Sequence, residues 1–420
     1  MSEKLIVQNF ADIQNIEICL NKINILIGPQ ASGKSICAKL LFYFKNFVWE
    51  ILNAVEDGQS KRQLDSSYIK RFEEYFPQDS WGDKQFVLRY EISDTFIQIE
   101  RVNEKKKLKF SYSDFYKKEI SAFRKYIDKI RQDVAIVDTR GLNRRSSIIF
   151  MARDYFTDRL TQSLDRRAAF SQLFIPATRS FFAFIERGIF SFLSSNKALD
   201  PFLTTFGSFY ESIKRSEIRS LDRLREKEIR NEIESLIEKI LCGKYVYEKG
   251  KDFIVSEGRR VSVANSSSGQ QETLPLAIII SFLATSSSRT VYVEEPEAHL
   301  FPSAQRDVIE LIATVFNSKP NQLQFFITTH SPYILTAINN LLQAGFLYER
   351  TESNEELKAK LKHIVPKIKA LNPSDVSAYS LGRKSCINLI SEDTGLINAS
   401  AIDSVSDELA IQFDKLLDLA

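Results

Sequence analysis

Hydrophobic and polar positions in the first 112 residues follow two periods, one typical of strands and one typical of helices. Residues 4–9 and 16–27 are expected to be strands, and the second ends in a mostly apolar run. A strand of this kind that enters a glycine-rich turn is typical of a buried parallel strand leading into a helix. Apolar residues at helical spacing then run from Ser35 to Ala54. Alternation between Gln85 and Tyr112 predicts antiparallel strands, with a solvated hairpin turn at Asn103–Lys106.

The later part of the chain is expected to alternate between helical and extended stretches. Residues 113–172 are predicted to be mostly helical, and residues 207–241 carry apolar side chains every three or four positions among many charges. That pattern predicts an amphipathic helix pair or a short coiled-coil arm, because sustained heptads are absent. Residues 244–263 alternate like a hairpin, with a turn near Glu257 and Gly258.

Composition narrows the function classes. The 420 residues are 44% hydrophobic, which is enough for a substantial core. The net charge of only +3 argues against a protein that coats nucleic acid through bulk charge. The four cysteines form no CxxC pair, so neither a disulfide framework nor a zinc knuckle is expected, and the expected location is cytoplasmic. No membrane association is expected, because the longest apolar stretch, Leu274–Ala284, is too short to span a bilayer.

The segment after the second predicted strand matches the phosphate-loop pattern G-x-x-x-x-G-K-[ST]. Its residues, all expected to bind nucleotide, are Gly28, Pro29, Gln30, Ala31, Ser32, Gly33, Lys34 and Ser35. Glycines let backbone N–H groups surround phosphate oxygens, and the following helix directs its positive end at the same anion. Lys34 is expected to reach the outer phosphates, and the Ser35 hydroxyl is expected to ligate Mg²⁺. A chance glycine-rich loop is the competing interpretation, and the strand–loop–helix context argues against it. ATP and Mg²⁺ are the predicted cofactors.

An apolar strand beginning at Thr290 ends in acidic residues. In a phosphate-loop fold, the first acid at such a strand end holds Mg²⁺ and the second orients or deprotonates the attacking water. Glu294 is therefore assigned to the metal and Glu295 to the water. Taken alone, this strand end would more often be a solvated turn. The metal position in most phosphate-loop relatives is Asp, and the extra methylene of Glu294 leaves slow turnover as an expectation.

Ser266–Gln270 precedes an apolar helical run and is similar to the LSGGQ signature of ABC ATPases. A hydroxyl residue and exposed N–H groups at a helix start form a second anion site, so Ser267, Gly269 and Gln270 are expected to bind the γ-phosphate held by an opposite subunit. A simple N-cap is the alternative interpretation. Pro275 is expected near the first turns of this helix or at a kink.

A further apolar strand ends at Thr328-Thr329-His330-Ser331-Pro332. His330 at this place resembles the switch histidine that contacts the γ-phosphate in ABC ATPases, and it is assigned a catalytic role beside Glu295. As a lone feature, a histidine here would more often be structural.

The order of these four motifs, the opening segment and Glu295–Pro302 resemble the ATPases of the OLD (overcoming lysogenisation defect) class, which is related to the SMC and DNA-repair ABC ATPases. The resemblance covers about residues 1–45 and 260–340. It implies that Glu297 and His299 lie in a loop that crosses a dimer interface. It also implies that Arg179, in a segment resembling one before the helical lobe of the family, contacts nucleotide or a partner subunit, although a surface arginine is the more usual case.

The resemblance implies an α/β fold: an ABC-type P-loop ATPase head, with a RecA-like core and an antiparallel β subdomain, plus a helical lobe or short coiled-coil insertion. The expected division is residues 1–112 for the first part of the head, 113–245 for the helical insertion, 246–345 for the second part of the head, and 346–420 for a C-terminal extension that binds a partner. The last segment lacks the D-x-D pair of the Toprim nuclease domain that OLD nucleases carry.

The chain therefore resembles stand-alone ATPases of bacterial phage-defence systems, namely PARIS, Septu and retron-linked modules, and the PARIS ATPase in particular. This resemblance implies a homodimer or higher homo-oligomer that senses infection, through DNA or a phage protein, and controls a separate effector such as a Toprim nuclease. The alternative is a DNA-repair or chromosome-structure ATPase that binds DNA through basic helices such as Lys214–Arg230. Salt-dependent binding of duplex DNA would favour that alternative. The nucleotide-binding subunit of a transporter is a weaker hypothesis. A scaffold that binds ATP without hydrolysing it is a further alternative, because Glu294 stands in the metal position.

Overall fold

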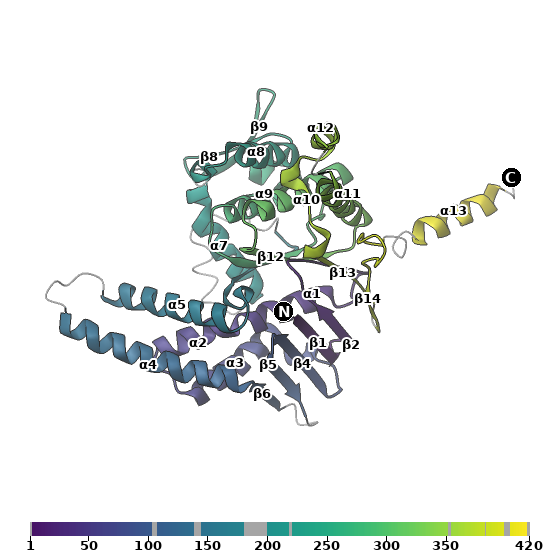
Figure 1. Cartoon of the computed structure of the whole chain (residues 1–420). Helices are drawn as coiled ribbons and strands as arrows, with labels where there is room; N and C mark the ends of the chain where they lie inside the picture. Colours follow the sequence, from purple (N-terminus) through teal and green to yellow (C-terminus); the bar gives the residue numbers. More distant parts are fainter. Residues whose placement is uncertain are drawn as a thin grey trace.

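The strands of the protein form three sheets, seen in a computed structural model that describes residues 2–102, 107–137, 144–179, 200–217, 221–351, 354–382, 384–398 and 404–417 (Figure 1). The strands are β1 (Glu3–Phe10), β2 (Ile13–Cys19), β3 (Ile23–Ile27), β4 (Phe86–Ile92), β5 (Thr95–Arg101), β6 (Leu108–Tyr112), β7 (Ser171–Ile175), β8 (Lys244–Glu248), β9 (Lys251–Ser256), β10 (Arg259–Ser262), β11 (Arg289–Glu294), β12 (Leu323–Thr329), β13 (Val376–Leu381) and β14 (Cys386–Asn388). The helices are α1 (Lys34–Lys45), α2 (Phe47–Glu56), α3 (Lys61–Tyr75), α4 (Asp114–Val137), α5 (Arg144–Ser163), α7 (Pro201–Glu217), α8 (Lys227–Leu241), α9 (Ser268–Leu283), α10 (Pro302–Ser318), α11 (Pro332–Arg350), α12 (Glu355–Ile364) and α13 (Ser404–Leu417).

The central sheet has the strand order β14-β13-β3-β12-β11-β7. Strands β13, β3, β12, β11 and β7 run parallel, and the short β14 pairs antiparallel with β13 at one edge. Parallel strands must be joined by crossovers, so neighbours in this sheet come from distant parts of the chain. The phosphate-loop strand β3 consequently lies between two strands that follow it by about 300 residues or more.

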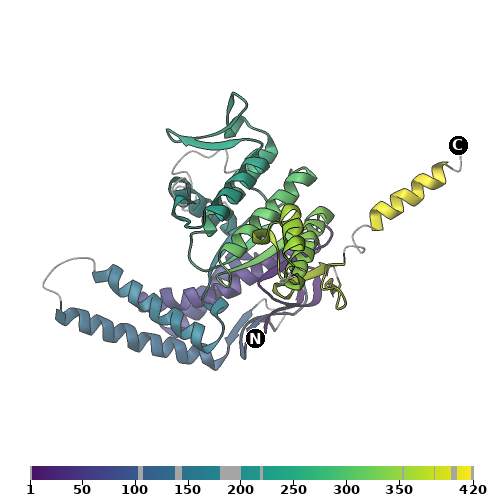
Figure 2. The ribbon, with the colours of Figure 1, turned by 45° about the horizontal axis from the view of Figure 1, so that its top comes forward.

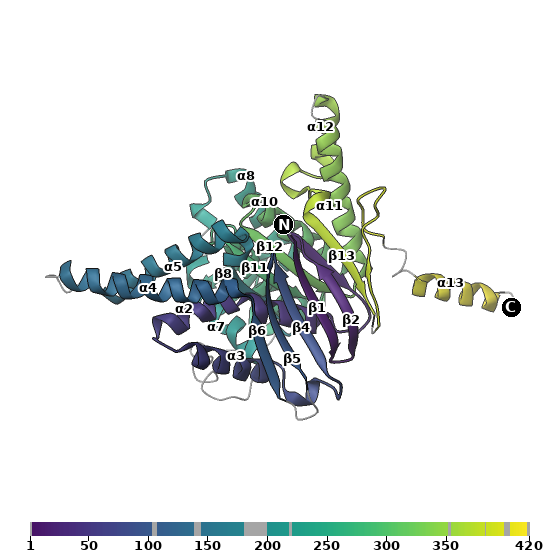
Figure 3. The same cartoon turned by 60° about the horizontal axis from the view of Figure 1, so that its bottom comes forward.

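Alternating residues of the central strands face two separate cores, as expected for a parallel sheet covered on both faces. Leu26, Tyr292 and Phe326 pack into the core shared with α1, α2 and the antiparallel sheet β2-β1-β4-β5-β6. Ile25 and Val291, their neighbours along the strands, pack into the core formed with helices α7 to α11. The molecule is therefore layered, with the antiparallel sheet and α1 on one face of the central sheet and a group of helices on the other (Figure 3).

Helices α4 and α5 form an arm that extends from the side of the antiparallel sheet (Figures 1 and 2). The rings of Tyr126 and Tyr155 stack across the arm at 3.7 Å, and Arg159 makes two hydrogen bonds of 2.6 Å to Glu119. Helix α13 lies apart from the body in all three views. Its described apolar side chains are exposed, namely Ile411, Phe413, Leu416 and Leu417. No helix within the described ranges is both long enough and apolar enough to span a bilayer.

The ATPase-head architecture with a helical lobe agrees with the fold class expected from the motifs, but several boundaries differ. Expected strand 16–27 is two strands, β2 and β3, which belong to different sheets. The expected helix from Ser35 breaks at Asn46, which ends α1 and begins α2. The expected hairpin at residues 244–263 has a third strand, because the chain also turns at Lys249 and Gly250. The expected turn at Asn103–Lys106 falls outside the described residues.

Two segments assigned to peripheral parts contribute strands to the central sheet. The stretch 113–172, expected to be mostly helical, ends in β7, which pairs with β11. The segment from residue 346, expected to be a separate extension, contains β13, which pairs with the phosphate-loop strand. A division at 113 and 346 therefore cuts through one sheet, because short strands far apart in sequence carry no periodicity that reveals their pairing.

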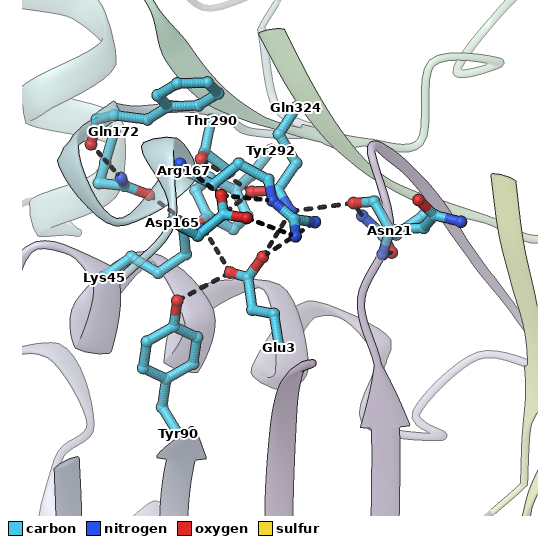
Figure 4. A network of polar contacts seen from close by, with 12 residues as sticks. Glu3, Asn21, Lys45, Tyr90, Asp165, Arg167, Gln172, Thr290, Tyr292 and Gln324 are labelled. Atoms are coloured by element: carbon cyan, nitrogen blue, oxygen red, sulfur yellow. Dashed lines mark hydrogen bonds and ion pairs between the residues drawn. The ribbon is translucent and has the colours of Figure 1, made fainter. Parts of the chain in front are cut away.

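A buried polar network joins the five-stranded antiparallel sheet, the central sheet and the end of α1 (Figure 4). The carboxylate of Glu3, on β1, accepts hydrogen bonds from Lys45 and from Tyr90, the latter at 2.7 Å. Gln324, on β12, donates to Glu3 at 2.9 Å and accepts from Lys45 at 2.8 Å. The Arg167 guanidinium, in the short 3₁₀ helix after α5, lies 3.5 Å from Glu3. This cluster fixes the antiparallel sheet, the end of α1 and the base of the arm against the central sheet.

Glu3 remains ionised in this setting. Burial alone would raise the pKa of Glu3, but the charges of Lys45 and Arg167 and the hydrogen bonds from Lys45 and Gln324 bring its pKa below the ordinary value. Both side chains of the Glu3–Lys45 pair are almost completely buried, with exposed fractions of 0% and 2%. Removing Lys45 would leave the buried Glu3 carboxylate with Arg167 as its remaining positive neighbour, which compensates its charge only in part.

We expect Lys45→Met to destabilise the protein by about 3 kcal/mol, because the buried Glu3 carboxylate loses its nearest positive charge and keeps only Arg167, at 3.5 Å. The double variant Lys45→Met/Glu3→Gln should recover part of that loss, since it removes the stranded charge. Denaturant unfolding followed by fluorescence measures both. Lys358→Met, which removes the exposed ion pair with Glu355, is the control and should change stability far less. A double variant less stable than Lys45→Met would contradict this account of the network.

Candidate functional site

The phosphate-loop segment lies between β3 and α1, as a strand, a loop and the start of a helix. Gly33 has a left-handed φ of 97°, which glycine adopts without strain. A Cβ at Gly28 would come within 2.2 Å of the carbonyl oxygen of Leu381 at the end of β13, so only glycine fits there. The Lys34 ammonium folds back over its own loop and donates to the carbonyl oxygens of Gly28 and Pro29, both at 2.7 Å. Burial lowers the pKa of Lys34, and the charges of Glu295 and Glu297 oppose that shift.

A pocket of about 530 Å³ opens beside this loop. Its walls are residues 30–36, Ala11 and Asp12 of the turn between β1 and β2, Asp79, Ser80, Gly82 and Glu295. Ala11 and Asp12 both have left-handed φ values, 49° and 66°, which place this turn toward the phosphate loop. The sequence did not predict the lining from Ala11, Asp12, Asp79, Ser80 and Gly82, because neither segment carries a motif.

Glu294 lies at the end of β11 next to Ser35. Burial raises the pKa of the Glu294 carboxyl, although the hydrogen bond from the Ser35 hydroxyl and the charge of Lys39 act in the opposite direction. Its Oε1 atom is buried without a hydrogen-bond partner, and so are Ser32 Oγ, Glu297 Oε2 and Thr328 Oγ1 in the same region. Buried polar atoms are rarely left unsatisfied. Mg²⁺ prefers oxygen ligands. The Ser35 hydroxyl and the Glu294 carboxylate, with its unpaired oxygen, therefore fit the metal that the motifs imply.

Glu295, Glu297 and His330 converge at the ends of β11 and β12. His330 Nδ1 lies 3.3 Å from Glu297 Oε1 and 3.7 Å from Glu295 Oε1. Glu297 is buried, and its Oε1 accepts hydrogen bonds from the Thr329 hydroxyl at 2.7 Å and from the backbone N–H of His330 at 2.8 Å. Glu295 and His330 are 34% and 43% exposed. Glu297 thus orients the histidine from within the protein, while the two side chains assigned catalytic roles reach the surface.

The backbone around these residues is strained. Glu295 and His299 have left-handed φ values of 42° and 58°, a conformation that is costly for residues with a side chain. Strain of this kind persists only where the surrounding structure holds it, and it concentrates at functional sites.

The signature segment starts α9. Ser267 is the N-cap, and its hydroxyl accepts from the backbone N–H of Gln270 at 3.3 Å, while Gln270 accepts from the N–H of Ser267 at 3.2 Å. This reciprocal pair is a capping box formed by Gln270. Gly269 packs against the carbonyl oxygen of His299, 2.8 Å from where a Cβ would stand. The exposed Ser267 is not among the residues that line the phosphate-loop pocket. Pro275, expected near the first turns or at a kink, lies inside α9.

Arg179 is neither a surface arginine nor among the residues that line the pocket beside the phosphate loop. Its side chain is buried, with 1% exposure, and it contacts the backbone of the acidic strand end, not the surface. The expectation of a contact with nucleotide or a partner failed because sequence cannot show that the segment after β7 turns inward beneath β11.

One protein family matches a part of the chain that contains several of these residues. Residues 194–335, which include the signature, the acidic strand and His330, match the AAA ATPase domain family. This part of the chain is therefore similar to an ATPase domain. An ATPase domain implies nucleotide binding, and Mg²⁺ is its usual companion. No curated protein sequence matches the chain.

Solved structures similar to the chain include three SMC head domains. One is the SMC head bound to the C-terminal winged-helix domain of ScpA, with 14% identity, 80% of this chain and 91% of that chain covered, and a TM-score of 0.39. Another is the SMC head domain from Thermotoga maritima, with 11% identity, 80% and 91% coverage and a TM-score of 0.34. The third is the SMC head domain of Pyrococcus furiosus with an extended coiled coil, bound to the C-terminal domain of ScpA, with 13% identity, 97% and 98% coverage and a TM-score of 0.36.

We expect Glu294→Gln to raise the stability of the nucleotide-free protein, by an amount on the order of 1 kcal/mol, because it removes a buried carboxylate that lacks a partner for one oxygen. The folded-state pKa of Glu294 lies above the unfolded value, so the folded wild type takes up a proton as the pH falls toward that pKa and gains stability. The difference in stability between Glu294→Gln and the wild type should therefore shrink as the pH falls. Thermal unfolding in buffers from about pH 8 to about pH 5 measures it.

The same variant should lose the stabilisation that Mg²⁺ and ATP give to the wild type, because stabilisation by a ligand requires binding to the folded state. Glu248→Gln, at an exposed carboxylate, is the control and should follow the wild type in both respects. A Glu294→Gln protein that melts below the wild type at every pH would show that this carboxylate is a structural requirement.

Proposed function

We propose that this chain binds and hydrolyses ATP in a head-to-tail homodimer, in which each nucleotide is held between the phosphate loop of one chain and the signature of the other. The observation that carries the proposal is the position of Ser267: it is an exposed helix start outside the pocket beside the phosphate loop. One phosphate loop and one signature that do not share a pocket need a second chain to complete a site.

The residues around the pocket suit ATP hydrolysis. The loop N–H groups and the start of α1 bind phosphate oxygens, and Lys34 must leave the carbonyls of Gly28 and Pro29 to reach them. Ser35 and Glu294 would hold Mg²⁺, which neutralises charge on the phosphates when bound. Glu295 accepts a proton from the attacking water, and His330, oriented by Glu297, donates a hydrogen bond to the γ-phosphate.

The surface around the catalytic residues suits an interface with a second chain. Phe301 lies just before α10, in the segment that follows Glu295, and Tyr333 lies in the first turn of α11, just after His330. Their large side chains are 78% and 54% exposed. Exposed aromatic residues beside partly exposed catalytic residues are typical of a site that is closed by a partner. ATP would then add charge-assisted contacts across the interface that ADP cannot make.

We further propose that the ATP-dependent dimer regulates a separate effector, such as a Toprim nuclease, in antiviral defence, with DNA or a phage protein as the trigger. The support is the resemblance of the motifs, chiefly Glu295–Pro302 and Thr328–Pro332, to the OLD class and its defence relatives. In the alternative, an SMC-like ATPase acts directly on DNA. Two cations assigned to DNA under that alternative already have acidic neighbours: Lys214 is ion-paired with Asp252, and Arg230 lies 3.7 Å from Asp222.

Lys34→Ala should abolish nucleotide binding, because it removes the charge that contacts the outer phosphates, whereas Glu295→Gln should bind ATP and keep it. The Glu295→Gln protein should therefore migrate as a dimer when ATP is present and lose hydrolysis by at least about 100-fold. Light scattering after size-exclusion chromatography and phosphate release measure these outcomes. Lys109→Ala, at a lysine of β6 that is 66% exposed, is the control for nucleotide binding. Normal hydrolysis by both Lys34→Ala and Glu295→Gln would overturn the assignment.

Mixing two inactive variants tests the composite site directly. Chains with Lys34→Ala and chains with Ser267→Arg should each be inactive alone. A mixed dimer pairs one intact phosphate loop with one intact signature, so about half of the dimers should carry one working site and the mixture should regain about a quarter of wild-type activity. Absence of any recovery would contradict the head-to-tail arrangement.

A further inference from the structure

The segment between β7 and residue 179 wraps around the end of the acidic strand. The backbone N–H of Ala177 donates to the Glu294 carboxylate, and Arg179 then turns its side chain beneath the next two peptide groups. Arg179 is one of the largest fully buried side chains among the described residues. A buried guanidinium with this many contacts is costly to place, and it persists only where its N–H groups are matched to acceptors.

The Arg179 guanidinium is matched to backbone carbonyls, not to a single carboxylate. Its Nη1 atom donates to the carbonyl oxygen of Glu294 at 2.7 Å and to that of Pro176 at 3.0 Å. Its Nη2 atom donates to the carbonyl oxygen of Glu295 at 3.1 Å. The two carbonyls of Glu294 and Glu295 bracket the Glu295 residue, so one rigid planar group fixes the peptide on each side of it.

This matters because Glu295 has a left-handed backbone, with a φ of 42°. Without an external constraint, a glutamate would relax toward the ordinary β or α region and rotate its carboxylate away from its present direction. The contact with Arg179 supplies that constraint together with the Glu295 N–H, which donates to the Thr328 carbonyl at 2.9 Å.

The other side of Arg179 is held by the signature helix. The Arg179 Nε atom donates to the carbonyl oxygen of Glu272 at 3.3 Å, and its backbone N–H donates to the Glu272 carboxylate at 3.0 Å. Glu272 is buried in α9, little more than one turn after Ser267. The side chain therefore lies between the start of the signature helix and the backbone of the residue assigned to the attacking water.

We infer that Arg179 is a positioning residue for catalysis: it holds the Glu295 backbone in its strained conformation, using the signature helix of its own chain as the fixed support. The inference rests on the proposed function of Glu295. It sets Arg179 apart from nucleotide binding, because none of its hydrogen-bond partners belongs to the phosphate loop.

Arg179→Lys tests the inference, since lysine keeps the charge but its single ammonium lacks the planar fork that reaches two carbonyls. A displacement of a catalytic group by about 1 Å can lower the rate on the order of 100-fold. We expect kcat to fall by about that factor while ATP binding, followed with a fluorescent ATP analogue, changes by less than about threefold. Arg289→Lys, at a partly buried arginine at the opposite end of β11, is the matched control and should leave kcat unchanged.

The mixed dimers separate positioning from a general need for Arg179 in folding. In a mixture of Lys34→Ala and Ser267→Arg chains, the working site takes its phosphate loop and its Glu295 from the Ser267→Arg chain. Adding Arg179→Lys to that chain should abolish the recovered activity, and adding it to the Lys34→Ala chain should spare it. Equal loss in both placements, or no loss in either, would overturn the inference. Absence of recovery in the parent mixture would instead count against the proposed dimer.

Discussion

The buried contact between Glu3 and Lys45 determines where the phosphate loop lies. Lys45 is the last residue of α1, and Lys34, which begins the same helix, is the lysine of the loop. A helix is a rigid rod over this length, so fixing its far end against Glu3 and Gln324 fixes its near end against the central sheet. The same carboxylate holds the base of the helical arm through Arg167. Loop, sheet and arm thus share one anchor at the end of the sheet remote from the site.

Buried polar atoms are hydrogen-bonded at one end of the central strands, whereas several lack a partner at the other end. At the beginning of β12, the side chain of Gln324 finds acceptors and donors on Glu3, Lys45 and Thr290. At the far ends of β11 and β12, Glu294 and Thr328 each keep a buried oxygen without a partner. A satisfied network adds rigidity, whereas unsatisfied groups cost stability and are retained where a ligand completes them. The end with the satisfied network thus serves structure, and the end with the unpaired oxygens is the candidate site.

Local motifs predicted the parts of the site that lie close together in sequence. The phosphate loop, the acidic strand end and the histidine after β12 each combine a strand signal with polar residues at its end, so a short window reveals them. The fold class followed from the order of those motifs. Whether Ser267 approaches a nucleotide stays a prediction, because a single chain cannot show it.

The sequence did not predict the features of the site that depend on contacts between distant segments. Arg179 carries no pattern that distinguishes a buried arginine from a surface one, and only the fold shows its carbonyl partners. The turn at Ala11 and Asp12 lines the pocket only because β1 and β2 fold back over the loop. Strand β13 was missed as part of the core sheet, since pairing with β3 across more than 300 residues leaves no trace in local periodicity.

The place of β13 beside the phosphate-loop strand also governs when the site can form during synthesis. The loop is made before β13, yet Gly28 packs against the carbonyl of Leu381 and β3 lacks this neighbour until residues 376–381 have left the ribosome. Until then, one edge of β3 has no strand partner from this sheet, and such edges are prone to wrong pairing. A nascent chain is thus expected to acquire nucleotide affinity only after residues 376–381 have been made and have paired with β3.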